Sequence, residues 1–155
     1  MGQTITTAML VIASLIAAIA LINAVLPATG RSAGALATAN SEAAQRIKTD
    51  IDVIYATGNT SGTITIWVKN VGTQIIRSVK SSDIIIIKPG GVSRLPYVSG
   101  CSSECWDYIL EDSAADWSTA VTVKFTVTTT VPAGSYSVSV AAPNGVTAVK
   151  DFSVS

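Results

Sequence analysis

Hydrophobic residues divide the chain into two parts with different periodicities. No side chain in residues 1–30 is charged, and residues 5–26, ITTAMLVIASLIAAIALINAVL, contain only four polar positions. As a helix this stretch is about 33 Å long, which matches a bilayer hydrocarbon core of about 30 Å. The pattern predicts a retained transmembrane or bundle-forming helix over residues 1–30. A cleaved secretory signal is the alternative, but its apolar core would be shorter and a basic residue would precede it.

Four alanines in the apolar segment fall on one stripe of a helix. Small side chains let helices approach closely, which favours their association in lipid, although alanine is also simply common in membrane spans. The predicted helix-packing positions are Ala13, Ala17, Ala20 and Ala24. Pro27 is expected to end or kink the helix, because it lacks a backbone N–H and clashes with the preceding turn.

Residues 31–57 carry the first charged side chains and stay rich in helix formers. We expect a helical stalk or linker there, which either continues the first helix to about Thr49 or restarts after Pro27. Around residues 50–55 the residue pattern begins to favour a strand over a helix.

From residue 62 the apolar period becomes two, as in a half-buried strand. Ile64, Ile66 and Val68 alternate with polar residues, and turn sequences such as Asn70-Val71-Gly72 separate the apolar runs. Strands are expected at residues 63–69, 74–80, 83–88, around 97, and at 106–110, 121–128, 136–141 and 146–154. Seven to eight short strands predict a mainly β fold, an immunoglobulin-like β-sandwich over residues 58–155 behind the long N-terminal α-helix. The larger aromatic residues are expected in the core or at sheet edges; they are Trp67, Trp106, Trp117, Phe125, Tyr136 and Phe152.

Composition excludes several classes of function. The chain has 155 residues, is 48% hydrophobic and carries ten basic and ten acidic side chains, so its net charge is zero and it lacks the basic clusters of nucleic-acid-binding proteins. Histidine is absent, which removes the commonest general base and metal ligand. No phosphate-binding, dinucleotide-binding or hydrolase motif occurs. We therefore expect no enzyme, no catalytic residue, no cofactor, no metal site and no nucleic-acid partner.

Two short motifs suggest covalent modification. Cys101 and Cys105 enclose a three-residue loop and predict a local disulfide, with two free buried thiols as the alternative. Asn59-Thr60-Ser61 is an N-glycosylation sequon, which makes Asn59 a candidate acceptor, although such triplets are common by chance.

Charge is uneven within residues 58–155. The first half carries most of the basic residues, whereas an acidic group follows at Glu104, Asp107, Glu111, Asp112 and Asp116. This acidic segment is interpreted as a solvated loop, with a subunit contact and a Ca²⁺ site as alternatives.

The layout resembles a known family. The uncharged apolar helix, the segment RIKTDIDVI at residues 46–54 and the strand WVKNVGTQII at residues 67–76 resemble the archaellum accessory proteins of the F/G family and, more distantly, archaellins. The most specific part is the turn that contains Lys69, Asn70 and Gly72. Archaellins and archaeal pilins usually carry a basic residue and a glycine before the helix, for prepilin-peptidase cleavage. Met1-Gly2-Gln3 has no Lys or Arg, which favours the uncleaved accessory proteins, and the CSSEC loop is not typical of the family.

The resemblance implies a structural component of the archaellum, the archaeal flagellum. Its expected partners are sister subunits in a homo-oligomer or filament, a related archaellum protein, the S-layer and membrane lipid. The expected location is the cell membrane, crossed once, with the β-domain extracellular or pseudoperiplasmic. Arg31 alone would favour the opposite orientation.

Three hypotheses remain open at this stage. The first is a membrane-anchored stator or filament-associated protein that contacts the cell envelope. The second is an archaellin or type IV pilin-like subunit that polymerises through its N-terminal helix and forms an extracellular filament. The third is a membrane-tethered adhesin or binding module, which would show an apolar pocket or an exposed aromatic patch.

Overall fold

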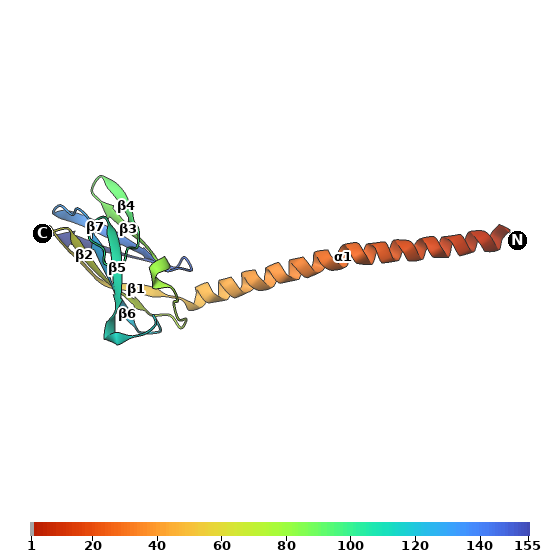
Figure 1. Ribbon diagram of the computed structural model, residues 1–155, viewed down its shortest axis with the longest axis horizontal. Helices are drawn as coiled ribbons and strands as arrows, with labels where there is room; N and C mark the ends of the chain where they lie inside the picture. The colour runs from red at the N-terminus through yellow and green to blue at the C-terminus, as the bar shows by residue number, and fades with distance from the viewer. Residues whose placement is uncertain (1) are drawn as a thin grey trace. The chain divides into compact units, whose positions relative to one another are not determined.

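The computed structural model describes residues 2–155, and its first element is one uninterrupted helix, α1 (Gly2–Lys48; Figure 1). Pro27 lies inside this helix, so the first helix continues, as one of the two expected alternatives has it, and does not end or restart at Pro27. A proline removes one intrahelical hydrogen bond, but the helix formers on both sides of Pro27 let the remaining backbone bonds continue. The chain divides into two compact units, one up to Ala43 and one from Ala44, which we call the helical unit and the β unit.

The segment 31–57, expected to be a helical stalk, is helical only as far as Lys48. Strand β1 (Ile51–Asn59) already occupies the rest of it. Ile51 and Val53 are buried in the core of the β unit, so burial of alternate residues decides the conformation from residue 51 onward.

Eight strands form the β unit, which confirms the predicted immunoglobulin-like β fold. They are β1, β2 (Thr63–Asn70), β3 (Asp83–Lys88), β4 (Gly91–Leu95), β5 (Cys105–Leu110), β6 (Thr122–Thr128), β7 (Gly134–Ala141) and β8 (Thr147–Val154). Hydrogen bonding joins them into one curled sheet in the order β4-β3-β7-β8-β1-β2-β6-β5.

The curled sheet has two four-stranded halves that meet at β8 and β1. Those two strands run parallel and share one register pair, Gly58 with Val154. A Cβ at Gly58 would lie 2.8 Å from Cγ2 of Val154, so a larger residue here would require the Val154 side chain to shift. Inward-facing side chains of both halves form a single core, with Ile66 and Phe125 from one half and Ile86 and Val138 from the other. The halves therefore pack face to face as the two layers of a sandwich.

The free ends of the sheet also approach each other. The backbone beyond β4 pairs with β5: Trp106 donates its N–H to the Pro96 carbonyl, and Val98 donates to the Trp106 carbonyl. Trp106 is fully buried, and its indole N–H donates to the Leu95 carbonyl at 3.0 Å. This contact leaves only part of each edge strand open to another chain.

Two strand predictions are wrong. Residues 74–80 form no strand: Ile76 makes one isolated bridge to Trp117, Ser78 has a positive φ of 58°, and a 3-10 turn, η1 (Val79–Ser81), follows. Near Tyr97 only a bridge to Trp106 forms, and the true strand, β4, starts at Gly91. In the first segment the one pairing partner, Trp117, lies far along the chain.

Trp67 also differs from its prediction. It is half-buried on the outer face of β2, a strand in the middle of its half-sheet, where it pairs with Tyr55 of β1 at 5.6 Å between ring centroids. It is thus neither a core residue nor a sheet-edge residue.

Candidate functional site

The helical unit presents its apolar side chains to the surroundings. No described residue of α1 is buried within the chain, and the helix is long and apolar enough to cross a membrane. Its hydroxyl groups bond to carbonyls of the preceding turn, as Thr7 does to Gln3 at 2.7 Å and Ser14 to Val11 at 2.8 Å. Since such hydroxyls need no water, the apolar part of α1 suits either lipid or the dry interior of a helix bundle.

The small stripe lies within this exposed part of the helix. Ala13, Ala17, Ala20 and Ala24 are all accessible. That they contact a second helix stays a prediction.

The turn after β2 is built around a fully buried amide. Asn70 has no exposed surface, and its Nδ2 donates to the carbonyls of Gln74 at 2.8 Å and Trp117 at 2.9 Å. Its Oδ1 accepts from the Gly72 N–H at 3.0 Å. One side chain therefore fixes both this turn and the segment around Trp117. Lys69, the preceding residue, points away from the core on the outer face of β2.

The same turn also forms hydrogen bonds to the last residue of α1 and to the segment that follows it. The N–H groups of Thr73 and Gln74 donate to the Lys48 carbonyl at 2.9 and 3.1 Å, and those of Val71 and Gly72 donate to the Asp50 carbonyl at 3.0 Å each. Helix ends leave carbonyls without intrahelical partners, and this turn supplies the donors. A Cβ at Gly72 would lie 2.6 Å from the Lys48 oxygen and closer still to the Asp50 nitrogen. Glycine is required here by space.

A second loop supports the same junction. Asn144 Nδ2 donates to Oγ1 of Thr49 at 2.7 Å, and Thr49 Oγ1 donates to the Gln45 carbonyl at 2.8 Å. A pocket of about 420 Å³, which includes Arg77 in its lining, opens beside these residues. Sequence reasoning missed Thr49 and Asn144 as junction residues, because their partners lie far apart in the chain. The turn sequence Pro143-Asn144-Gly145 was the only local signal.

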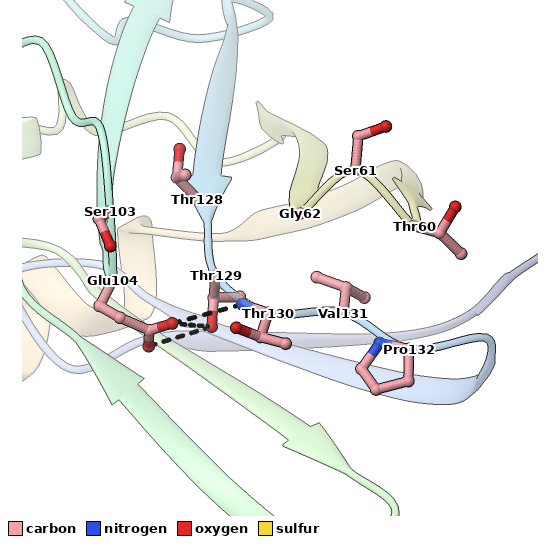
Figure 2. Close-up of a pocket in the computed structure, with 10 residues that line it drawn as sticks. All are labelled: Thr60, Ser61, Gly62, Ser103, Glu104, Thr128, Thr129, Thr130, Val131 and Pro132. Atoms are coloured by element: carbon pink, nitrogen blue, oxygen red, sulfur yellow. Dashed lines mark hydrogen bonds between the residues drawn. The ribbon is translucent and has the colours of Figure 1, made fainter.

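The cysteine loop lies beside a pocket of about 420 Å³ (Figure 2). Cys101 and Cys105 are joined by a disulfide with a Cα–Cα distance of 5.7 Å. Within the loop Glu104 points toward Thr129, whose hydroxyl donates to both carboxylate oxygens at 3.0 and 3.1 Å, as Figure 2 shows. Glu104 thereby fastens the disulfide loop to the segment that follows β6.

The sequon residue Asn59 is exposed at the end of β1. Its Oδ1 accepts from the Thr63 N–H at 3.0 Å, so the side-chain oxygen stabilises the β1–β2 turn. Its glycosylation stays a prediction.

The acidic residues are dispersed. Asp107 accepts from the backbone N–H of Gly100 at 2.8 Å, and the described residues hold no group of three or more His, Cys, Asp and Glu side chains placed to bind a metal. Burial raises the pKa of the Tyr108 phenol, with smaller contributions from Tyr97 and Asp107. Hydrogen bonds from the Arg94 guanidinium to Asp83, at 2.7 and 2.9 Å, raise the Arg94 pKa. None of these shifts marks a catalytic pair.

An exposed apolar helix and an immunoglobulin-like β unit define a structural protein of a surface or membrane assembly. The model of the archaeal-type flagellin family matches residues 2–152, and the chain belongs to this family. It is a structural component of the archaellum, as the sequence resemblance predicted; the family is not known for enzymes.

Solved structures of archaellum proteins share the β fold. The archaellum periplasmic stator protein FlaG from Sulfolobus acidocaldarius is 24% identical over 67% of this chain and 99% of that chain, with a TM-score of 0.57. A chain of the archaellum periplasmic stator protein complex of FlaF and FlaG from Sulfolobus acidocaldarius is 24% identical over 66% of this chain and 87% of that chain, with a TM-score of 0.56. The archaeal flagellin FlaB1 from Methanocaldococcus jannaschii is 14% identical over 68% and 90%, with a TM-score of 0.59. No curated protein matches the chain.

Archaellum proteins are membrane-anchored or extracellular, and they assemble with other archaellum subunits. An exposed apolar helix such as α1 fits both locations.

Proposed function

We propose that this chain is a membrane-anchored archaellum protein whose helix crosses the cytoplasmic membrane once and whose β unit stands outside the cell. In this role it is a stator or a filament-associated protein. The β unit then contacts sister subunits, a related archaellum protein or the S-layer, and the helix contacts lipid.

The observation that carries this proposal is the division of α1 into an apolar part and a polar part. Residues 5–26 supply about 33 Å of uncharged helix, which spans a bilayer core. The continuation to Lys48 is exposed and carries Arg31, Glu42 and Arg46. A helix with this division can place its second part in water without burying a charge.

The disulfide supports an external β unit. Disulfides persist in oxidising surroundings and are rare in the cytosol. Cys101–Cys105 therefore outweighs the single Arg31, which by the positive-inside rule would favour a cytoplasmic β unit.

A filament subunit is the second candidate. The family match covers α1 as well as the β unit, which favours a role in which the helix itself assembles. Apolar helices that leave the membrane would then form the dry core of a polymer.

Motility of a deletion strain tests the proposed function. We expect cells that lack this chain to lose swimming, and a plasmid copy to restore it. A copy that carries Ala17→Arg should fail to restore swimming, because a charge in the apolar part opposes burial in lipid or in a bundle. A matched Ala37→Arg copy, changed in the polar part of the helix, should succeed. Swimming by the deletion strain would contradict the proposal.

Sodium carbonate extraction separates the two candidates. A membrane-anchored protein stays in the pellet with lipid and is released by detergent. A filament subunit is recovered instead from sheared extracellular material.

A further inference from the structure

One buried hydroxyl in the β unit lacks a hydrogen-bond partner. Ser82, which follows η1, is 8% exposed, and its Oγ is the one buried side-chain oxygen or nitrogen among residues 2–155 that forms no hydrogen bond. Its backbone N–H is satisfied, because it donates to the Val79 carbonyl at 2.9 Å. A buried polar group without a partner costs free energy and is rare in folded proteins, so this hydroxyl needs an explanation.

Ser82 lines a pocket of about 340 Å³, located where the backbone beyond β4 pairs with β5. We call it the seam pocket, and its polar side chains are Lys80, Ser82, Asp83 and Arg94. They come from η1, the residue after η1, β3 and β4. The volume lies within the range of small-molecule sites, and an unpartnered hydroxyl in the lining is a group that a ligand could satisfy.

The ion pair of the β unit orients one cation in this pocket. Arg94 Nε donates to both carboxylate oxygens of Asp83, at 2.7 and 2.9 Å. Among residues 2–155 no acceptor takes a hydrogen bond from the two terminal NH2 groups of Arg94. These groups form a planar pair of donors, the geometry that binds a carboxylate through two parallel hydrogen bonds.

The charged groups favour a ligand with a single negative charge. Lys80 is the second cation of the seam pocket and Asp83 is its one carboxylate, so the lining has one net positive charge at neutral pH. A carboxylate ligand balances that charge. A dianion such as phosphate would bring a second negative charge close to Asp83, which opposes its binding.

The other side of the seam pocket is apolar and aromatic. It is formed by Leu95, Pro96, Tyr97 and Trp106, and the ring centroids of Tyr97 and Trp106 lie 5.1 Å apart. The indole N–H of Trp106 already donates to the Leu95 carbonyl, so the indole offers only carbon surface. A small ring attached to the carboxylate can pack against such a wall.

We propose that the seam pocket binds a small ligand that carries a carboxylate group on a compact ring. The carboxylate accepts hydrogen bonds from the terminal NH2 groups of Arg94, from Lys80 and from Ser82. No hydrogen bond holds Ser82 Oγ in its present rotamer, so rotation about χ1 toward the ligand breaks none. The ring packs against Pro96 and Tyr97. This site is additional to the archaellum role and does not depend on it.

Calorimetric titration of the full chain in detergent tests the choice of ligand. Benzoate and benzamide have the same ring and nearly the same shape, but only benzoate carries a negative charge. We expect benzoate to bind at least tenfold more tightly than benzamide, after subtraction of a titration into detergent alone. Equal affinities, or no binding of benzoate, would overturn the proposal. Tighter binding of inorganic phosphate than of benzoate would overturn the assignment of a carboxylate.

Replacement of the arginine tests the charged contact. Arg94→Gln should lower the affinity for benzoate at least tenfold, because the planar donors and one positive charge are lost. Arg77→Gln removes the same charge from an exposed residue outside the seam pocket and is the matched control. If both variants bind benzoate as the unmodified chain does, the seam pocket is not the site.

Replacement of the serine separates ligand binding from a structural role. Ser82→Ala should lower the affinity for benzoate about fivefold, as the loss of one hydrogen bond predicts. It should leave Tm unchanged or raise it, since the hydroxyl has no partner within the chain. Ser81→Ala, at the exposed neighbouring residue, should change neither quantity. A lower Tm for Ser82→Ala with unchanged affinity for benzoate would refute its role as a ligand-binding residue.

Discussion

Replacement of the buried amide in the β2 turn should destabilise the β unit strongly. Asn70→Ala removes two donated bonds, to Gln74 and Trp117, and one accepted bond, from Gly72. The Trp117 carbonyl keeps a bond from Ile76, and the Gly72 N–H keeps its bond to Asp50, so only the Gln74 carbonyl loses a partner that nothing else supplies. At about 1 kcal/mol for each of the three lost bonds, we expect a loss of about 3 kcal/mol.

Thermal unfolding of the full chain in detergent, followed by tryptophan fluorescence, measures this loss. For a domain of this size, about 3 kcal/mol lowers Tm by roughly 10–15 °C. Asn59→Ala is the matched control, since that asparagine is exposed and accepts a single bond. A Tm for Asn70→Ala within about 3 °C of the control, where roughly 1 kcal/mol or less is at stake, would refute the reasoning.

A second substitution at the same position tests whether the buried site requires an uncharged amide. Asn70→Asp keeps the shape but directs a carboxylate oxygen at two carbonyl oxygens in a buried site. Burial and these neighbours should raise the pKa of the introduced carboxyl above its unfolded value of about 3.9. A group with a raised folded-state pKa binds its proton more tightly in the folded chain, so stability falls as pH rises through that range. We expect Asn70→Asp to lose more stability at pH 8 than at pH 5, while Asn70→Ala loses the same amount at both.

Three further changes test other parts of the account. Gly72→Ala should lower Tm at least as far as Asn70→Ala, because the new methyl group meets the Lys48 oxygen, and an unchanged Tm would contradict the required approach. Cys101→Ser with Cys105→Ser should cost about 2 kcal/mol in chemical denaturation, as expected for so short a loop; no change on reduction of the wild type would argue against the bond. Asn59→Gln should abolish any glycan-dependent shift in gel mobility of the chain from its native cells, and a shift that persists would remove Asn59 as the acceptor.

Much of the fold could be predicted because its determinants are local. The uncharged run over residues 5–26 defines a helix by composition alone, and period-two alternation around Ile64 and Phe125 defines strands that the structure confirms. The sequence left open whether the helix ends at Pro27 or continues to about Thr49. It continues, because the cost of one proline is small against the many bonds of a helix this long.

The remaining errors concern long-range partners. Residues 74–80 were expected to form a strand, but only Ile76 forms a bridge, to Trp117, and so no ladder forms. Trp67 was expected to be buried or at an edge because of its size. Its position on the outer face of β2 follows from register, which places Ile66 and Val68 inward.

The contacts at the end of α1 also could not be predicted from local sequence. The Asn-x-Gly sequence at Asn70 was visible as a turn. Its contact with the carbonyls of Lys48 and Asp50 depends on where the helix ends in space, which no local pattern encodes.

The central claim is that the apolar part of α1 is buried in lipid or in a helix bundle while the β unit is exposed outside the cell. Labelling of intact cells with a membrane-impermeant maleimide tests it most directly, with single cysteines introduced as Leu15→Cys in the helix and Thr65→Cys in the β unit. The account predicts rapid labelling of Thr65→Cys, and labelling of Leu15→Cys only after detergent is added. Equal labelling of both positions in intact cells, or labelling of the helix position alone, would contradict it.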